Sequence, residues 1–310
     1  MRYRVTHRTA YGYDDDVDDS YGVAHLVPRP LPWQYVADHT LAISPRPLTL
    51  RTELDGYGNE LTYFQVTEPH RELVIDSVSD IDVVDTLYDQ AALQQPWEQS
   101  RPATSDARSA WSATQFALES PLAEHAPGVH EYAAASLTPS RPISEAMTDL
   151  ISRIHADFEY DATATTVTST VAQVLTERAG VCQDFAHLTL ACLRSHGIAA
   201  RYVSGYLATT PPPGKDRVVG ADASHAWVAV WLPGADQWLA VDPTNDQWVG
   251  ERYVTVAWGR DYNDVAPVKG VIFTEAKRST LDVSVDVAPQ QSVPGACPEP
   301  VEGPVEGENT

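Results

Sequence analysis

The first part of the chain alternates hydrophobic and polar residues with the period of two that is typical of β-strands. Turn residues separate the alternating runs, and helical periodicity is almost absent from this region. Strands are predicted within residues 3–13, 39–45, 48–54, 55–66 and 71–84. Several short strands with turn signals between them predict an antiparallel β-sandwich-like domain over residues 1–85.

The pattern changes at residue 86. Residues 86–142 are rich in Gln, Ala, Ser and Pro, which predicts short helices between prolines and a helical segment that connects two domains. Further along, hydrophobic residues recur at spacings of three and four, at Met147, Leu150, Ile151 and Ile154. This spacing predicts a helix that Ser144 caps, and a second domain that begins near residue 143.

Residues 143–288 combine a helical half with a β-rich half. Another helix is predicted from Cys182, with Gly197 where a left-handed C-cap glycine would lie. Strand-like runs follow at residues 200–208, 217–221, 224–232 and 237–242. The expected fold class is therefore α+β. Residues 289–310 repeat Pro-Val-Glu-Gly without an apolar period, which predicts a disordered tail.

Composition fits a soluble protein with more than one domain. The chain has 310 residues, of which 43% are hydrophobic and 21% charged. No apolar run approaches the roughly 18 to 20 residues of a membrane span, so no membrane association is expected. The first residues lack the apolar core of a signal peptide, and a cytoplasmic location is the expectation.

The net charge excludes one large class of partner. A formal charge of −22 without any basic cluster repels phosphate backbones, so no nucleic-acid partner is expected. The acidic run at residues 14–19 is interpreted as a solvated loop between two strands rather than a metal site. Motifs for metal ligation and phosphate binding are missing from the sequence, so neither a metal nor a cofactor is expected.

The cysteines differ in their predicted surroundings. The chain contains Cys182, Cys192 and Cys297, an odd number without a Cys-x-x-Cys pair, which indicates free thiols. Cys182 begins a helix, where unpaired backbone N–H groups and the helix dipole favour a thiolate. Cys192 lies deep in the same helix and is interpreted as a structural thiol, and Cys297 as an exposed thiol of the tail. By position alone, Cys182 is either a nucleophile or a small buried residue.

A histidine and an aspartate in the following strands complete a catalytic constellation. His225 lies on the same strand face as Trp227, and a tight turn at Pro233-Gly234 would pair residue 225 directly with Asp242. The carboxylate could then orient the imidazole as a base for Cys182. A slip of one residue would move Asp242 to the opposite face. Taken alone, Asp242 also fits an ordinary turn that ends a strand.

Other polar and aromatic residues near this constellation have structural interpretations. His187 and His196 are expected to be core or partly exposed residues of the cysteine helix, and Asp184 to interact with the helix dipole. The tryptophans could line a substrate cleft, although aromatic residues on strands more often fill a core; these are Trp227, Trp231, Trp238 and Trp248.

Several long motifs resemble a known family. They are GVCQDFAHL, ARYVSGY, GADASHAWVAVWLPG, VDPTND and VTVAWGRDYNDVAPVKGV, preceded by THRTAYGYDDDV and DGYGNELTYF. In this order they resemble the bacterial transglutaminase-like family, a branch of the transglutaminase and papain-like cysteine superfamily. The resemblance covers residues 1–288. It implies a papain-like core at residues 143–288, in which the nucleophile helix packs on an antiparallel sheet, behind a β-rich N-terminal domain.

The resemblance also implies chemistry. It implies a Cys-His-Asp triad at Cys182, His225 and Asp242 that attacks amide bonds of a peptide or protein through a thioester. Hydrolysis is the first expectation, acyl transfer to an amine is the second, and a non-catalytic binding module is the third. The backbone N–H of Cys182 would be one oxyanion donor.

Two further implications concern the surroundings of the site. Eukaryotic transglutaminases use a tryptophan as the second oxyanion donor, and the segment before Cys182 contains none, so Gln183 or Tyr160 is the candidate. A calcium-binding loop is also missing, which disfavours a calcium-switched crosslinker. The loop at residues 207–220 and the N-terminal domain are expected to set selectivity. By resemblance alone, ATP-grasp and α-helical proteins are possible partners.

Overall fold

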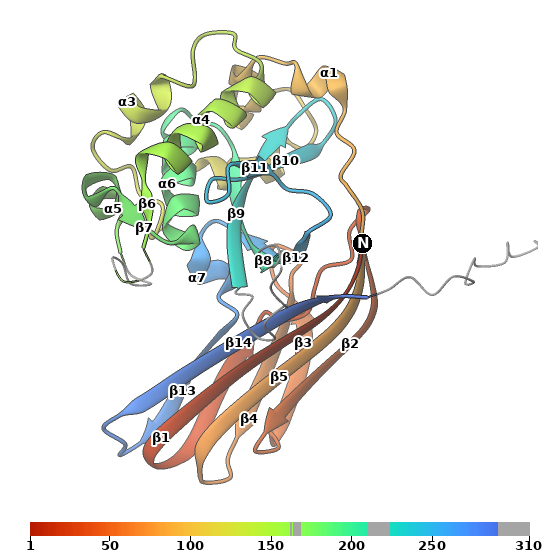
Figure 1. Cartoon of the computed structure of the whole chain (residues 1–310), viewed down its shortest axis with the longest axis vertical. Helices are drawn as coiled ribbons and strands as arrows, with labels where there is room; N and C mark the ends of the chain where they lie inside the picture. Colours follow the sequence, from red (N-terminus) through yellow and green to blue (C-terminus); the bar gives the residue numbers. More distant parts are fainter. Residues whose placement is uncertain (162, 164–168, 210–223, 291–310) are drawn as a thin grey trace, which may run out of the picture.

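The computed structural model describes residues 1–161, 163, 169–209 and 224–290. The strand predicted at residues 217–221, most of the loop at residues 207–220, and the tail with Cys297 lie outside this part of the chain. Within it, the α+β class is confirmed. A curled antiparallel sheet forms one part of the molecule, and helices packed on a smaller sheet form the other (Figure 1).

The curled sheet is built around one long strand. Its strand order is β2-β5-β1-β4-β3, and β13 and β14 also pair with β1. The strands are β1 (Arg2–Ala24), β2 (Gln34–Ser44), β3 (Thr49–Leu54), β4 (Glu60–Val66), β5 (His70–Val83), β13 (Val268–Thr274) and β14 (Ser279–Pro289). The first half of β1 lies between β5 and β14, and its second half lies between β4 and β13. The antiparallel N-terminal part is thus a half-barrel made of one sheet (Figure 1).

Two predictions about this sheet were wrong. Residues 268–288 were assigned to the core at residues 143–288, but the strands β13 and β14 within this stretch pair with β1 instead. Alternation predicts a strand without predicting its partner, and here the partner is more than 240 residues away. The acidic run is no loop either, because β1 continues through it with a register shift between Val17 and Asp19. Asp14 pairs with Arg278, and Asp16 pairs with Arg71.

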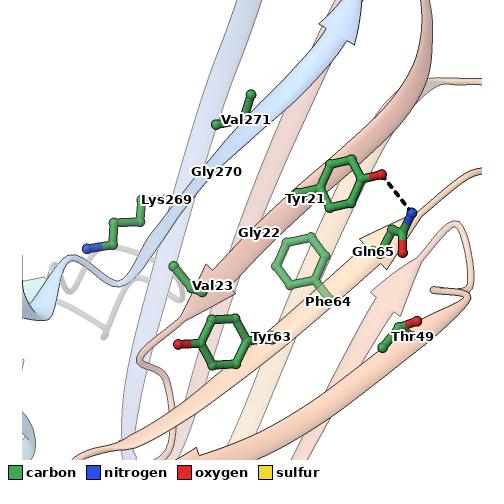
Figure 2. Close-up of a pocket in the computed structure, with 10 residues that line it drawn as sticks. All are labelled: Tyr21, Gly22, Val23, Thr49, Tyr63, Phe64, Gln65, Lys269, Gly270 and Val271. Carbon is green, nitrogen blue, oxygen red and sulfur yellow. Dashed lines mark hydrogen bonds between the residues drawn. The ribbon is translucent and has the colours of Figure 1, made fainter. Parts of the chain in front are cut away.

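A shallow apolar hollow lies on the outward face of the sheet (Figure 2). Gly22 and Gly270 pair directly at its centre, where neither contributes a side chain. Around them stand Tyr21 and Tyr63, and the Tyr21 hydroxyl accepts a hydrogen bond of 2.9 Å from the amide of Gln65 (Figure 2). A Cβ atom on Gly22 would lie 2.1 Å from the Phe64 ring, so the close packing of this ring requires glycine.

The connecting segment consists of short helices, as its prolines predict. They are α1 (Gln90–Leu93), η1 (Trp97–Ser100), η2 (Pro102–Thr104), α2 (Ala110–Thr114), η3 (Gln115–Ala117) and α3 (Val129–Ala134). Trp97 and Val129 are buried in the same hydrophobic cluster as the following helix α4 (Ile143–Asp157). The segment therefore packs into the core. The predicted Ser144 cap was wrong, because α4 already begins at Ile143 after Pro142.

The core sheet has the order β11-β10-β9-β8-β12 and is antiparallel. The remaining elements are β6 (Glu159–Tyr160), α5 (Val171–Glu177), β7 (Ala179–Gly180), α6 (Cys182–Ser195), β8 (Ala200–Leu207), β9 (Ser224–Leu232), β10 (Gln237–Asp242), β11 (Gln247–Trp248), β12 (Tyr253–Gly259) and α7 (Tyr262–Val265). On β9, Val228 and Val230 belong to the cluster that contains α6, whereas Trp227 and Ala229 face the opposite side. Both faces of this sheet are thus covered.

Side chains of the curled sheet cover the outer edge of β12. The buried amide of Gln34 donates to the carbonyl of Thr255 over 2.7 Å and accepts from its N–H over 2.8 Å. Asn59 forms the same pair of bonds with the backbone of Trp258, at 2.8 and 2.9 Å. These amides satisfy backbone groups that an edge strand would otherwise leave exposed. The two parts of the molecule are therefore joined by specific polar contacts.

Candidate active site

The local sequence fixes both ends of helix α6. At its start, the buried Asp184 carboxylate accepts a hydrogen bond of 2.8 Å from the N–H of Val181. At its end, Gly197 has a φ of +74°, and the N–H groups of Gly197 and Ile198 bond back to α6 carbonyls. This is the predicted glycine C-cap. Cys182 is the first residue of the helix, so its backbone N–H lies in the turn that lacks intrahelical acceptors.

The hairpin that positions the histidine differs from the prediction by two residues. Leu232 pairs with Gln237, and Val228 pairs with Val241, so the turn spans residues 233–236. Asp236 has a φ of +51°, which closes this longer turn. In this register Asp242 stands opposite Trp227 instead of His225. The prediction of a direct pair was therefore wrong, but an even shift keeps both side chains on one face.

His225 still reaches Asp242 diagonally across the hairpin. Its Nε2 atom donates to Asp242 Oδ2 over 2.7 Å. The Tyr253 hydroxyl and the Asn245 amide donate to the same oxygen, each over 2.7 Å. The other oxygen accepts from the backbone N–H groups of Thr244 and Asn245, at 2.8 and 3.2 Å. A fully buried carboxylate with this many donors is held in one orientation.

The electrostatics of this pair favour a charged histidine. Burial lowers the pKa of His225, but the hydrogen bonds to Asp242 and to the Cys182 side chain outweigh it and raise the pKa to about 10. Burial likewise raises the pKa of Asp242, but the bond from His225 outweighs it and holds this pKa below its usual range. At neutral pH the geometry thus holds an imidazolium between a carboxylate and the Cys182 sulfur.

The predicted residues therefore come together from three separate elements. Nε2 of His225 is occupied by Asp242, which leaves Nδ1 for the hydrogen bond with Cys182. Gln183 follows Cys182 in the first turn of α6. Tyr160 lies on β6 opposite Gly180, two residues before Cys182, and burial and the nearby Cys182 raise its pKa.

Sequence reasoning missed two residues of this site. Asn245 belongs to the motif after Asp242, where its amide could have been proposed as a second support for the carboxylate. Tyr253 comes from β12, whose place beside β8 follows only from the sheet topology. No local signal identifies it, because a buried tyrosine on a strand usually fills a core.

The remaining candidates occupy structural positions. Cys192 is fully buried, and burial raises its pKa to about 12. Burial lowers the pKa of His187 to about 3, and this ring accepts from the N–H of Tyr262 over 3.2 Å. His196 ends α6 and stacks on His130 with 3.9 Å between ring centroids.

Comparisons with known proteins agree with this architecture. One family model, described as the bacterial transglutaminase-like N-terminal region, matches residues 3–82, and another, the transglutaminase-like superfamily, matches residues 131–243. A solved structure from Cytophaga hutchinsonii, provisionally described as a cysteine protease, shares the fold with a TM-score of 0.71. It is 20% identical and covers 95% of this chain and 93% of its own. The fold is thus that of the transglutaminase-like proteins.

Sequence relatives match nearly the whole length of the chain. An uncharacterized protein of Mycobacterium tuberculosis is 52% identical over 294 residues, which are 93% of each chain. Another from Mycobacterium leprae is 34% identical over 289 residues, which are 92% of this chain and 98% of that protein. The chain belongs to the bacterial transglutaminase-like family. Within the described ranges, the structure contains no helix that is long and apolar enough to cross a membrane.

Proposed function

We propose that this protein is a thiol enzyme that cleaves amide bonds of peptides, or of glutamine or asparagine side chains, and transfers the acyl group to water. Cys182 is the nucleophile, His225 the proton carrier and Asp242 the orienting carboxylate. The observation that carries the proposal is the His225 ring, which contacts Cys182 on one side and donates to Asp242 over 2.7 Å on the other.

In the first half-reaction, the Cys182 thiolate attacks the carbonyl carbon and a C–S bond forms. The carbonyl oxygen becomes an oxyanion near the first turn of α6, where the Cys182 N–H can donate to it. His225 then gives its Nδ1 proton to the amide nitrogen, and the C–N bond breaks. A histidine with a pKa of about 10 carries this proton at neutral pH. The amine leaves, and Cys182 is held as a thioester.

The second half-reaction needs the opposite behaviour from the same ring. The thiolate contributes to the raised pKa of His225, so its conversion to a neutral thioester lowers this pKa. The deprotonated ring can then take a proton from water while the water oxygen attacks the thioester. Collapse of the intermediate expels the thiolate, returns the acid product, and leaves the proton on His225.

The second oxyanion donor is proposed to be Gln183 or Tyr160. Gln183 lies one residue after the nucleophile, and Tyr160 lies across β6 and β7 from the start of α6. The Gln183 amide can supply an N–H donor and the Tyr160 hydroxyl an O–H donor. Either would take the place of a tryptophan N–H, because the segment leading into Cys182 contains no tryptophan.

Alkylation with iodoacetamide tests the nucleophile. We expect Cys182 to be modified near neutral pH much faster than the fully buried Cys192, as measured by mass spectrometry of the labelled peptides. Release of amines from a library of N-acylated peptides should fall by at least about 10³-fold in Cys182→Ala. Equal, slow labelling of both thiols would contradict an activated nucleophile and would favour a binding module.

The acceptor is tested in the same assay. Excess primary amine is added, and the acid and the amide conjugate are measured side by side. Hydrolysis predicts that the acid remains the main product, because no feature of the described residues marks a pocket for an amine. A dominant conjugate would replace hydrolysis by acyl transfer and would leave the roles of Cys182 and His225 unchanged.

A further inference from the structure

A second cavity lies on the outer face of the core sheet, apart from the cysteine helix. Its volume is about 480 Å³. Arg201 of β8, Trp238 of β10 and Trp258 of β12 contribute side chains from this face. Segments that flank the curled sheet supply the opposite wall, including Trp33 and Leu87. The cavity therefore exists only because the two parts of the chain pack together.

Arg201 is a buried charge that forms no hydrogen bond or ion pair with another of the described residues. Its exposed fraction is 7%, and its Nε atom has no hydrogen-bond partner. The guanidinium carbon lies 3.6 Å from the ring centroid of Trp258 and 4.3 Å from that of Trp238. Within the described residues, neither a carboxylate nor a carbonyl bonds to this guanidinium. The two tryptophan rings stack against the guanidinium, and stacking does not satisfy its N–H donors.

Another buried arginine, Arg194 on helix α6, shows what a structural role requires. Arg194 is 1% exposed, and all three of its guanidinium nitrogens donate to carbonyl or hydroxyl oxygens at 2.6 to 3.3 Å. Burial lowers the pKa of both arginines, and for Arg201 no hydrogen-bond acceptor among the described residues compensates. A buried charge that lacks its acceptors is destabilising unless a ligand supplies them.

We propose that this cavity binds a ligand that carries a single carboxylate on a flat apolar body. The planar N–H fork of Arg201 matches two carboxylate oxygens, and the indole and aliphatic walls match an apolar body. Asp85 and Asp236 also line the cavity, and their exposed carboxylates repel a dianion such as phosphate more strongly than a monoanion. A free aromatic acid and the C-terminus of a peptide share this chemistry.

The cavity is distinct from the proposed catalytic residues. Arg201 pairs with Ala229, and Gly205 pairs with His225, so four residues of β8 separate the two levels. At the rise of a β-strand this is about 13 Å. The buried Trp227 lies between them on the same face of β9. Ligand binding here therefore goes beyond the proposed amide cleavage, and it is measured in the Cys182→Ala background because two of the probes carry an amide bond.

Calorimetric titration of the full chain tests the proposal. The probes are phenylacetate, N-acetylphenylalanine as a model of a peptide C-terminus, the neutral phenylacetamide, and inorganic phosphate. We expect at least one acid to bind at least about tenfold more tightly than phenylacetamide and phosphate. The tighter of the two acids identifies the source of the carboxylate. Arg201→Met should weaken acid binding by at least about tenfold, and Arg201→Lys should weaken it less.

Two variants of exposed leucines test the proposal even if Arg201→Met does not fold. Leu87 at the cavity is 88% exposed, and Leu54 on β3 is 70% exposed and lies outside the cavity. Leu87→Glu should weaken acid binding through repulsion, whereas Leu54→Glu should leave it unchanged. The proposal is overturned if neither acid binds, if phenylacetamide binds as tightly as the acids, or if both glutamate variants bind the acids like the unmodified chain.

Discussion

At the scale of single residues, the candidate site depends on how Asp242 is held. The carboxylate is fully buried and accepts hydrogen bonds from Tyr253, Asn245 and the backbone of the following turn, in addition to His225. These donors fix the carboxylate before the imidazole adds its own bond. The side chain of His225 is therefore oriented by a rigid acceptor, as its proposed role as a proton carrier requires.

Asp242→Asn tests this coupling. Removing the carboxylate removes the largest contribution that raises the pKa of His225, so this pKa should fall from about 10 toward its ordinary value near 6.5. Titration of the His225 ring by ¹H–¹⁵N NMR measures the midpoint. Asp246→Asn is the control, because Asp246 bonds to Ser152 instead. An unchanged midpoint in Asp242→Asn would show that Asp242 does not set the protonation of His225.

At the scale of elements, the strand β8 pairs with β9, and a glycine of β8 lies opposite His225. Gly205 pairs directly with His225 and faces both Trp227 and the neighbouring strand β12. An added Cβ atom would lie 2.1 Å from the carbonyl oxygen of Val254 and 2.6 Å from the Trp227 ring. The close approach of strands beside His225 therefore requires a residue without a side chain.

Gly205→Ala should therefore destabilise the core sheet. Because the clash involves backbone, the strand has to move, and we expect the free energy of unfolding in urea to fall by about 1–3 kcal/mol. Gly56→Ala provides the control, since a Cβ atom there meets nothing within 4 Å. If both variants unfold at the same urea concentration as the unmodified chain, the packing at Gly205 is looser than these distances indicate.

At the scale of the whole molecule, the curled sheet and the core share buried polar contacts. His7 on β1 bonds to the Tyr206 hydroxyl of β8 over 2.9 Å and to Thr9 over 3.0 Å. Burial lowers the pKa of His7 to about 4. Together with the hydrogen bonds of Gln34 and Asn59 to the backbone of β12, this contact makes the half-barrel a structural support of the sheet that carries His225.

Acid should weaken this junction. The unfolded chain protonates His7 below its ordinary pKa of 6.5, whereas the folded chain does so only near pH 4. Stability from this group is therefore complete above pH 6.5 and is lost as the pH falls, by roughly 3 kcal/mol at pH 4. His7→Gln, which does not titrate, should show a flatter decline in the free energy of unfolding between these pH values. Parallel declines in both proteins would contradict the assignment.

The sequence predicted local features of this structure better than contacts between distant segments. The alternation on β9 predicted its two faces, and Gly197 predicted the end of the cysteine helix, because both patterns arise within a few residues. Alternation also placed His225 and Asp242 on one face. Alternation did not predict the register of the hairpin, because the turn contains four residues and Asp236 has a left-handed conformation.

Contacts between distant segments were beyond sequence reasoning. Residues 279–289 pair with the first strand of the chain, and the sequence of this segment does not indicate that partner. Tyr253 of β12 bonds to Asp242, and the sequence around Tyr253 does not indicate this contact either. Arg201 reads as an ordinary charged strand residue until the tryptophans of two other strands stack on it. These features depend on which elements become neighbours.

The sequence by itself determined the local elements, the shared strand face of His225 and Asp242, and the position of Cys182 at the start of a helix, because side-chain periodicity and caps act over a few residues. The hairpin register, the discontinuous half-barrel and the stacking of the buried Arg201 on two tryptophans depend on the packed chain as a whole. Strand pairing and burial are properties of neighbours in space, and the free energy that selects them is gained only when the whole chain packs.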